Sequence, residues 1–301
     1  MLNTGFSPWP SYSEEEAAIV ANVLLSNQVN YWTGTQGKAF EDEYANWCGT
    51  KYAVALSNGT VALEVALKAL GIGPGDEVIT SPRTFIASAS AIVAVGANPV
   101  FADVELTNQN ISSRTISDVI TPATKAIIVV HLAGLPAEMD EILQLAAEHN
   151  LYVIEDCAQA HGAQYKGKSV GSIGDIGCWS FCQDKIITTA GEGGMVTTNN
   201  KAIYDFIWSY KDHGKNPDKV FDLPKPNGQF RWLHDSFGSN YRMTEIQAAI
   251  GRYQLTQLES WSQTRRAYMS RYDAVIDKFS FLKKLVTPSH SKHAGYKYYF
   301  S

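Results

Sequence analysis

The chain has 301 residues, of which 45% are hydrophobic and 18% are charged, and its formal net charge is −5. This composition suits a globular protein with a large core and excludes a disordered chain. The negative balance and the scattered lysines and arginines give no electrostatic basis for nucleic-acid binding. No apolar run approaches the length of a membrane span, and the N-terminal residues lack a signal-peptide pattern.

Strands and helices are expected to alternate along most of the chain. Short apolar runs predict strands, and i, i+3, i+4 spacing of apolar residues predicts helices between them. The strands are expected at 53–56, 78–80, 99–104, 126–131, 151–155, 177–181 and 195–198, and the helices at 60–70, 86–95 and 137–149. This order predicts an α/β fold of parallel βαβ units with both faces of the sheet covered. Two strands follow each other closely after residue 177, so the sheet is predicted to be mixed.

The remainder of the chain is expected to be a loop followed by long helices. Residues 216–228 are rich in Pro, Lys and Asp and predict an exposed loop. Helices are expected at 243–261 and 265–278, and residues 293–301 have the pattern of a beginning strand. We therefore expect a large domain over 1–255 and the start of a smaller, incomplete α+β domain over 256–301.

The cysteines predict no disulfide framework and no metal site. There are four of them in the whole chain, which is too few for a disulfide scaffold of this size. Cys178 and Cys182 have no second pair beside them, and Cys157 and Cys178 are expected to pack in the core. The expected compartment is a reducing cytoplasm.

Four side chains between residues 156 and 185 have the chemistry that pyridoxal phosphate requires. The carboxylate of Asp156 can keep the ring nitrogen protonated, and the amide of Gln159 can contact the ring oxygen. The hydroxyl of Ser180 can hold phosphate, and the amine of Lys185 can bind the aldehyde as a Schiff base. Each has an ordinary alternative, since a lysine in a glycine-rich loop is usually solvated and an aspartate after a strand is commonly a helix cap.

Three further features have a functional and a structural interpretation. Gly59 and Thr60, at a predicted helix start, can bind an anion or simply form an N-terminal cap. Phe85 can stack on a planar ring or lie in the core. His161 can carry a proton near the site or be a structural histidine. A Ser-His-Asp hydrolase is excluded because the chain has no G-x-S-x-G motif.

Taken in order, the motifs resemble those of one family. SNGT (57–60), PRTF (82–85), DCAQAHGA (156–163), SFCQDK (180–185), AGEGG (190–194), KDHG (211–214) and GSNYRMTEIQAAIG (238–251) resemble the DegT/DnrJ/EryC1/StrS sugar aminotransferases, which are pyridoxal-phosphate enzymes of fold type I. The resemblance runs from about residue 31 to the end of the chain.

The resemblance assigns a role to each motif residue. It implies that Lys185 binds the cofactor covalently, that Asp156 pairs with the ring nitrogen and that Asn240 reaches the phosphate of a neighbouring subunit. The other implied cofactor residues are Gly59, Thr60, Phe85, Gln159 and Ser180. It implies no role for His213 or Arg242, although both lie in family motifs.

The implied activity is transfer of an amino group, with glutamate as donor, to a 3- or 4-keto-hexose linked to a nucleotide. Such a homodimeric enzyme would serve amino-sugar or surface-polysaccharide biosynthesis in the cytoplasm. The alternatives are an aminotransferase for a non-sugar cyclic ketone and a catalytically silent regulatory relative.

Overall fold

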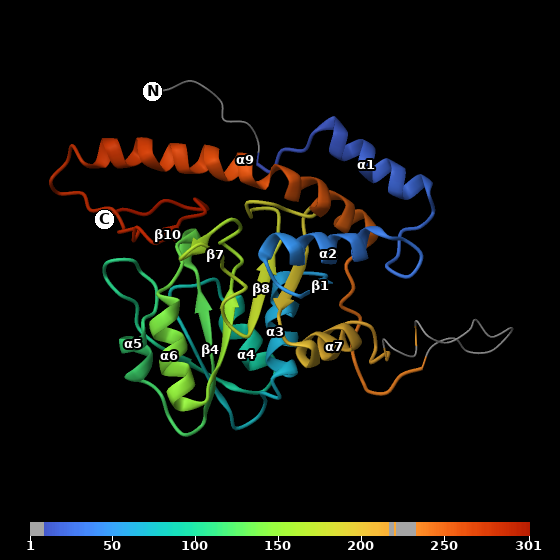
Figure 1. The fold of residues 1–301 in the computed structure, drawn as a ribbon, viewed down its shortest axis with the longest axis horizontal. Coiled ribbons are helices and arrows are strands. Elements are labelled where there is room, and N and C mark those ends of the chain that lie inside the picture. Colours follow the sequence, from blue (N-terminus) through green and yellow to red (C-terminus); the bar gives the residue numbers. More distant parts are fainter. Residues whose placement is uncertain (1–8, 217–219, 221–232) are drawn as a thin grey trace, which may run out of the picture.

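A seven-stranded mixed sheet forms the centre of the computed structural model, which describes residues 9–216, 220 and 233–301 (Figure 1). The spatial order is β1-β9-β8-β5-β4-β2-β3, and β9 runs antiparallel to both of its neighbours while the other pairs are parallel. The strands are β1 (Tyr52–Leu56), β2 (Glu77–Thr80), β3 (Asn98–Phe101), β4 (Thr124–Val130), β5 (Tyr152–Asp156), β8 (Ile176–Ser180) and β9 (Gly194–Thr198). The α/β fold class and the mixed sheet are confirmed.

Helices cover both faces of this sheet, as continuous apolar strands require. The helices, some of which pack on other helices rather than on the sheet, are α1 (Glu14–Leu25), α2 (Gln36–Cys48), α3 (Gly59–Ala69), α4 (Ala87–Ala94), α5 (Ser113–Ser117), η1 (Leu132–Gly134), α6 (Met139–His149), α7 (Lys201–Tyr210) and α9 (Glu245–Ile276). One buried cluster joins α3, α4 and α7 to one face. On the other face, α5 and α6 pack on one part of the sheet and α2 and α9 pack on another.

Successive residues of β8 contribute to the buried clusters on opposite faces of the sheet. Cys178 belongs to the cluster with α3, whereas the next residue, Trp179, belongs to the cluster with α2 and α9. Both side chains are buried, because neighbouring side chains of a strand point to opposite faces. Cys157 and Cys178 are buried packing residues, as predicted.

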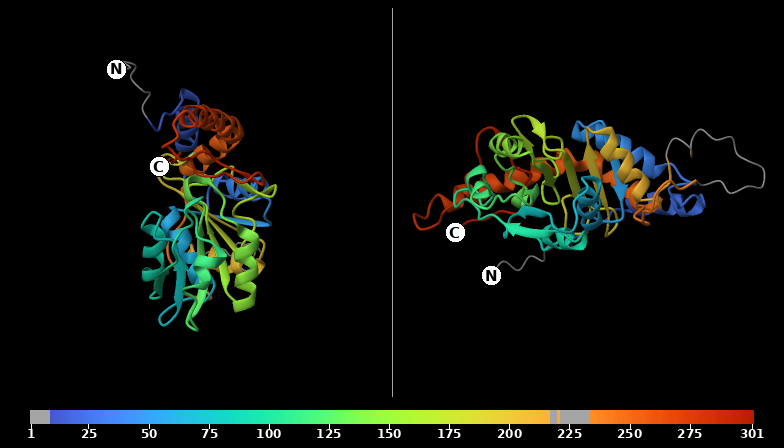
Figure 2. Two further views of the ribbon diagram at one scale, coloured as in Figure 1. Left: turned by 90° about the vertical axis from the view of Figure 1, so that its left-hand side faces the viewer. Right: turned by 90° about the horizontal axis from the view of Figure 1, so that it is seen from below.

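Helix α9 lies across one end of the sheet with α1 beside it (Figures 1 and 2). Its first turn is capped by Thr244, whose side chain accepts the N–H of Gln247 while the Gln247 side chain accepts the N–H of Thr244. The predicted break between residues 261 and 265 is wrong, because the helix is continuous from Glu245 to Ile276. Residues 262–264 include no glycine or proline, and Ser262 is fully buried, so packing carries the helix through this point.

A small three-stranded sheet lies beside the main one. It has the order β10 (Ser291–Lys292), β6 (Gln164–Tyr165) and β7 (Lys168–Ser169), and β6 and β7 form a hairpin around residue 167. The expected strand over 293–301 is wrong, since only an isolated bridge at Phe300 forms there. The N–H groups of Ala294 and Lys297 instead donate to the carbonyls of the turn at 133–134. The predicted loop at 216–228 lies almost entirely outside the described residues.

Candidate active site

A cavity of about 820 Å³ opens where the carboxyl ends of the parallel strands meet the start of α3. In open α/β sheets this edge is where ligands bind. Asp156 ends β5 and Ser180 ends β8, so the two side chains arrive from neighbouring strands. All the predicted cofactor residues of this chain except Asn240 line the cavity: Gly59, Thr60, Phe85, Asp156, Gln159, Ser180 and Lys185.

One end of the cavity is built for an anion. Asn58 caps α3 by accepting the N–H of Val61, so the N–H groups of Gly59 and Thr60 lie in the first turn, where the helix supplies no acceptor. A Cβ atom at Gly59 would lie 2.6 Å from the Cβ atom of Ser180. Glycine is therefore required for this close approach between α3 and β8. Two backbone donors and a hydroxyl converge there, which fits the phosphate of the predicted cofactor.

Asp156 is a buried carboxylate held by two hydrogen bonds. Its Oδ2 atom accepts the hydroxyl of Ser88 at 2.8 Å, and its Oδ1 atom accepts the N–H of Ala158 at 3.1 Å. Burial raises the pKa of Asp156, and the hydrogen bonds from Ser88 and Ala158 oppose that rise. A cation placed against this carboxylate would relieve the cost of its burial. The environment therefore fits a protonated ring nitrogen.

Gln159 and Phe85 present a polar and an aromatic surface to the same cavity. The Oε1 atom of Gln159 accepts the N–H of Ala133 at 2.7 Å, which orients the amide so that its NH₂ group remains a donor. Phe85 is 69% exposed and lies just before α4, so it is not a core aromatic. Both residues fit a planar ring with one oxygen substituent.

Lys185 brings an amine into the cavity, and its side chain is only 15% exposed. Its Nζ atom lies 2.9 Å from Oδ1 of Asp184 and 5.5 Å from the centre of the Tyr296 ring. Asp184 also accepts the hydroxyl of Tyr296 at 2.5 Å. Burial works against the ionised form of Asp184, but the hydrogen bonds from Tyr296 and Lys185 outweigh it and hold the pKa of this carboxyl below its ordinary value. Asp184 and Tyr296 thus hold the lysine at the cavity.

Sequence reasoning missed the residues that support the predicted ones. Ser88 lies on α4 and Tyr296 lies near the end of the chain, and neither belongs to a motif that carries the chemistry. Tyr296 and Asp184 are 112 positions apart, so no local spacing links them. For Ser88 the sequence does offer a signal, because a hydroxyl in the first turn of a helix that starts at the sheet edge can reach a neighbouring strand end.

Asn240 lies away from this cavity. It is exposed and forms a β-bridge with Asp212. Asp212 is fully buried and accepts hydrogen bonds from Trp32, Lys215 and Arg242. The KDHG and GSNYRM motifs therefore meet in one polar cluster, which fixes the backbone that presents Asn240. Arg242 belongs to this cluster, and it does not line the cavity.

His161 is fully buried against aromatic rings. Its ring centre lies 5.2 Å from that of Trp179 and 5.5 Å from that of Phe181. Neither ring nitrogen has a hydrogen-bond partner in the described part of the chain. Burial lowers the pKa of His161 to about 3, and the charges of Lys185 and Arg265 add to the effect. His161 is therefore neutral at physiological pH and does not line the cavity, which favours the structural interpretation.

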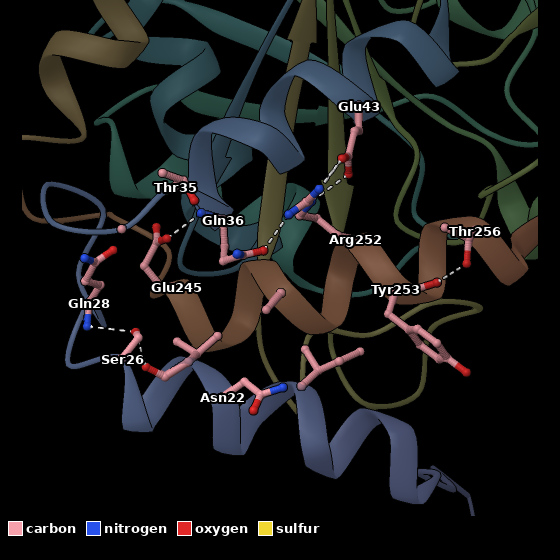
Figure 3. A pocket seen from close by; sticks show the side chains of 14 residues that line it. Asn22, Ser26, Gln28, Thr35, Gln36, Glu43, Glu245, Arg252, Tyr253 and Thr256 are labelled. Carbon is pink, nitrogen blue, oxygen red and sulfur yellow. Dashed lines mark hydrogen bonds and ion pairs between the residues drawn. The ribbon is translucent and has the colours of Figure 1, made fainter.

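The charged side chains that line a second cavity, between α1, α2 and α9, are held by ion pairs or hydrogen bonds within the protein (Figure 3). Its volume is about 570 Å³. Arg252 forms an ion pair with Glu43 at 2.6 Å, and the buried Glu245 accepts the N–H groups of Gln36 and Gly37. These contacts attach the start of α2 to α9.

A buried cluster near β5 has metal-ligand residue types but is occupied by hydrogen bonds. His131, Glu155 and Cys157 each bring one such atom to within 4.8 Å of the others. Glu155 accepts the N–H groups of Gly171 and Gly174, both at 2.8 Å, and interacts with Nε2 of His131 at 3.0 Å.

In the part of the chain that the structure describes, no helix is long and apolar enough to cross a membrane.

The edge of the parallel strands thus combines the anion site of Gly59, Thr60 and Ser180 with a buried aspartate and a lysine. This arrangement defines the chain as a pyridoxal-phosphate enzyme of fold type I. The family model of the DegT/DnrJ/EryC1/StrS aminotransferases matches residues 10–301, and the chain belongs to that family.

Known proteins similar to this chain include aminotransferases for sugars. GDP-perosamine synthase of Escherichia coli O157:H7 is 44% identical over 266 residues, a match that covers 87% of this chain and 69% of that protein. The UDP-N-acetyl-3-dehydro-alpha-D-glucosamine 3-aminotransferase of Acidithiobacillus ferrooxidans is also 44% identical, over 80% of this chain and 62% of that protein. The crystal structure of an aminotransferase from Psychrobacter cryohalolentis superposes with a TM-score of 0.92 at 53% identity, covering 98% of this chain and 77% of that one.

Proposed function

We propose that this protein transfers an amino group from glutamate to a 3- or 4-keto-hexose linked to a nucleotide, in the biosynthesis of an amino sugar for a surface polysaccharide. The observation that carries the proposal is the meeting of Lys185 and Asp156 in one cavity with an anion site. The similarity to sugar aminotransferases supports the substrate class. Four free cysteines support a reducing cytoplasm as its compartment.

The cofactor supplies an aldehyde that exchanges amino groups and a ring that accepts electrons. In this proposal Gly59, Thr60 and Ser180 bind its phosphate, and Phe85 covers one face of its ring. Gln159 donates to the ring oxygen through Nε2.

Two residues of the chain act on protons, one by holding a proton in place and the other by moving one. The Asp156 carboxylate, oriented by Ser88 and Ala158, keeps a proton on the ring nitrogen. The Nζ atom of Lys185, once free of the cofactor, would move a proton between the α-carbon of the amino donor and the carbon that the cofactor's aldehyde supplies. Asp184 and Tyr296 keep that amine within reach of the cavity.

The covalent site is tested by labelling. Protein supplied with pyridoxal phosphate should absorb visible light, lose that band on borohydride reduction, and carry the label on the peptide that contains Lys185. Lys185→Ala should fold and should lack the band. A label on another lysine would overturn the assignment. A panel of nucleotide-linked keto-sugars, with glutamate as donor, tests the substrate class, and the absence of any amino sugar product would overturn it.

A further inference from the structure

Two cations at the rim of the active-site cavity lack acidic partners. Arg83 and Lys297 both line the cavity and are exposed, whereas Asp156 and Ser180 lie buried inside it. Among the described residues, no carboxylate lies within ion-pair distance of Arg83 or Lys297. The nearby Asp184 is already engaged by Lys185 and Tyr296. The lining also includes the exposed Glu192, so the feature that distinguishes the rim is not an excess of positive charge but two cations without an acidic partner in the described part of the chain.

Contacts between distant segments hold these cations in place. The guanidinium of Arg83 lies 5.0 Å from the centre of the Tyr299 ring, and its Nη1 atom donates to Gln109. Lys297 lies two residues from Tyr299, and its backbone N–H donates to the carbonyl of Ala133 at 3.2 Å. Stacking on an aromatic face leaves most guanidinium N–H groups free to bind an anion.

We propose that Arg83 and Lys297 bind the diphosphate of the nucleotide-linked sugar. This inference rests on the proposed function and names the recognition site within it. A diphosphate bears adjacent negative charges, which match two unpaired cations on one rim. Arginine binds phosphate oxygens in pairs and lysine binds them as a point charge. A diphosphate at the exposed rim leaves the sugar ring directed toward Lys185 and the nucleoside directed outward.

The competing ligand is a carboxylate of the amino donor. That group is attached close to the reacting carbon, which must reach Lys185 inside the cavity. Binding to the exposed rim suits a group separated from the reacting carbon by a sugar ring. The two ligands are distinguished by which substrate the variants affect.

The experiment compares Arg83→Gln, Lys297→Gln and the double variant with Lys168→Gln, which removes an exposed lysine that lines neither cavity. Calorimetry measures binding of UDP and GDP, and of uridine and guanosine, to protein loaded with cofactor. For the diphosphate that the wild type binds, each single variant should weaken binding about tenfold and the double variant about a hundredfold. Binding of the nucleosides should not change, and Arg83→Lys should restore part of the loss. Lys168→Gln should bind as the wild type does.

Steady-state kinetics give the second measurement. The KM for the keto-sugar should rise with the loss of diphosphate binding, while the KM for glutamate and the visible band of the cofactor stay unchanged. A rise in the glutamate KM alone would assign the rim to the donor and overturn the proposal. Unchanged diphosphate affinity in the double variant, or no diphosphate binding to the wild type, would also overturn it. If no keto-sugar reacts but diphosphate binding falls as expected, the proposed reaction fails and the rim site stands.

Discussion

At the scale of single residues, Asp156 is distinguished from a helix-capping aspartate by its surroundings. It accepts one side-chain and one backbone hydrogen bond, it lines the cavity, and burial raises its pKa. A carboxylate is costly to bury without a cation beside it. The buried carboxylate of Asp156 nevertheless lies at the end of its strand, where a protonated ring nitrogen could pair with it.

Asp156→Asn should keep the covalent cofactor band and lose turnover by about 100- to 1000-fold, because the amide offers no charge to the ring nitrogen. Single-turnover kinetics with glutamate measure the effect. Ser88→Ala is the matched control, since it removes one hydrogen bond to Asp156 at 2.8 Å and keeps the carboxylate. We expect its loss to be much smaller. Turnover equal to wild type in Asp156→Asn would instead make Asp156 a structural cap.

His161 should make the protein sensitive to acid. Its folded-state pKa of about 3 lies below the ordinary value of 6.5, so the unfolded chain takes up a proton more readily than the folded chain does. The stabilising effect is present above pH 6.5 and is lost as the pH falls toward 3. One proton contributes a slope of up to about 1.4 kcal/mol per pH unit to the free energy of unfolding.

His161→Phe should remove the contribution of this one proton from the pH dependence of the free energy of unfolding. It should leave the aromatic packing with Trp179 in place. Urea unfolding at pH 7, 6 and 5 measures it in both proteins. The buried His293, whose pKa burial lowers to about 4, acts in the same direction and remains in both. Equal slopes in the two proteins would show that His161 does not titrate on unfolding.

At the scale of elements, the features that could be predicted from the sequence are those that local residue patterns determine. Continuous apolar runs identified the strands of the main sheet, and the motif residues lie together because each follows a strand end or starts a helix on one edge. The length of α9 was not predictable, because Ser262 and its neighbours are polar and only their burial shows that the helix continues. The rim cations were missed for a similar reason, since Arg83 meets Tyr299 only in the folded chain.

Gly251 determines how closely α9 packs on α2. A Cβ atom there would lie 2.6 Å from Cζ of Phe40, a fully buried ring that packs against Tyr44 and Phe181. Gly251→Val should therefore lower the free energy of unfolding by about 1 to 3 kcal/mol. Gly73→Val is the control, because a Cβ at Gly73 would approach nothing closer than 3.7 Å. Chemical denaturation measures both, and equal stability of the two variants would contradict the packing argument.

At the scale of the whole molecule, α9 and the end of the chain connect the two expected domains. The proposed boundary at 255/256 falls inside α9, which runs from Glu245 to Ile276 without interruption. Residues 294–299 return to the cavity and place Tyr296 against Asp184. The division into a large domain and a smaller one stays a prediction, and residues from both sides of that boundary line the cavity.

The position of Asn240 bears on how the protein assembles. Asn240 is exposed, it is anchored through Asp212, and it does not line the cavity of its own chain. We infer that it donates to the cofactor phosphate of a second copy in a homodimer with shared sites. Asn240→Ala should then weaken cofactor binding by roughly 1.5 to 3 kcal/mol, the value of a hydrogen bond to a charged group. Cofactor titration followed by visible absorbance measures this loss.

Mixing defective chains provides the decisive test of shared sites. In a heterodimer of Lys185→Ala and Asn240→Ala chains, the site with an intact Lys185 receives its asparagine from the Lys185→Ala chain and is complete. The other site has neither residue. Co-expressed and separately tagged chains should therefore recover one working site per heterodimer, although each parent is defective. The control is Lys185→Ala mixed with the double variant Lys185→Ala/Asn240→Ala, which can form no complete site. Heterodimers that form without recovering activity would show that each site is built within one chain.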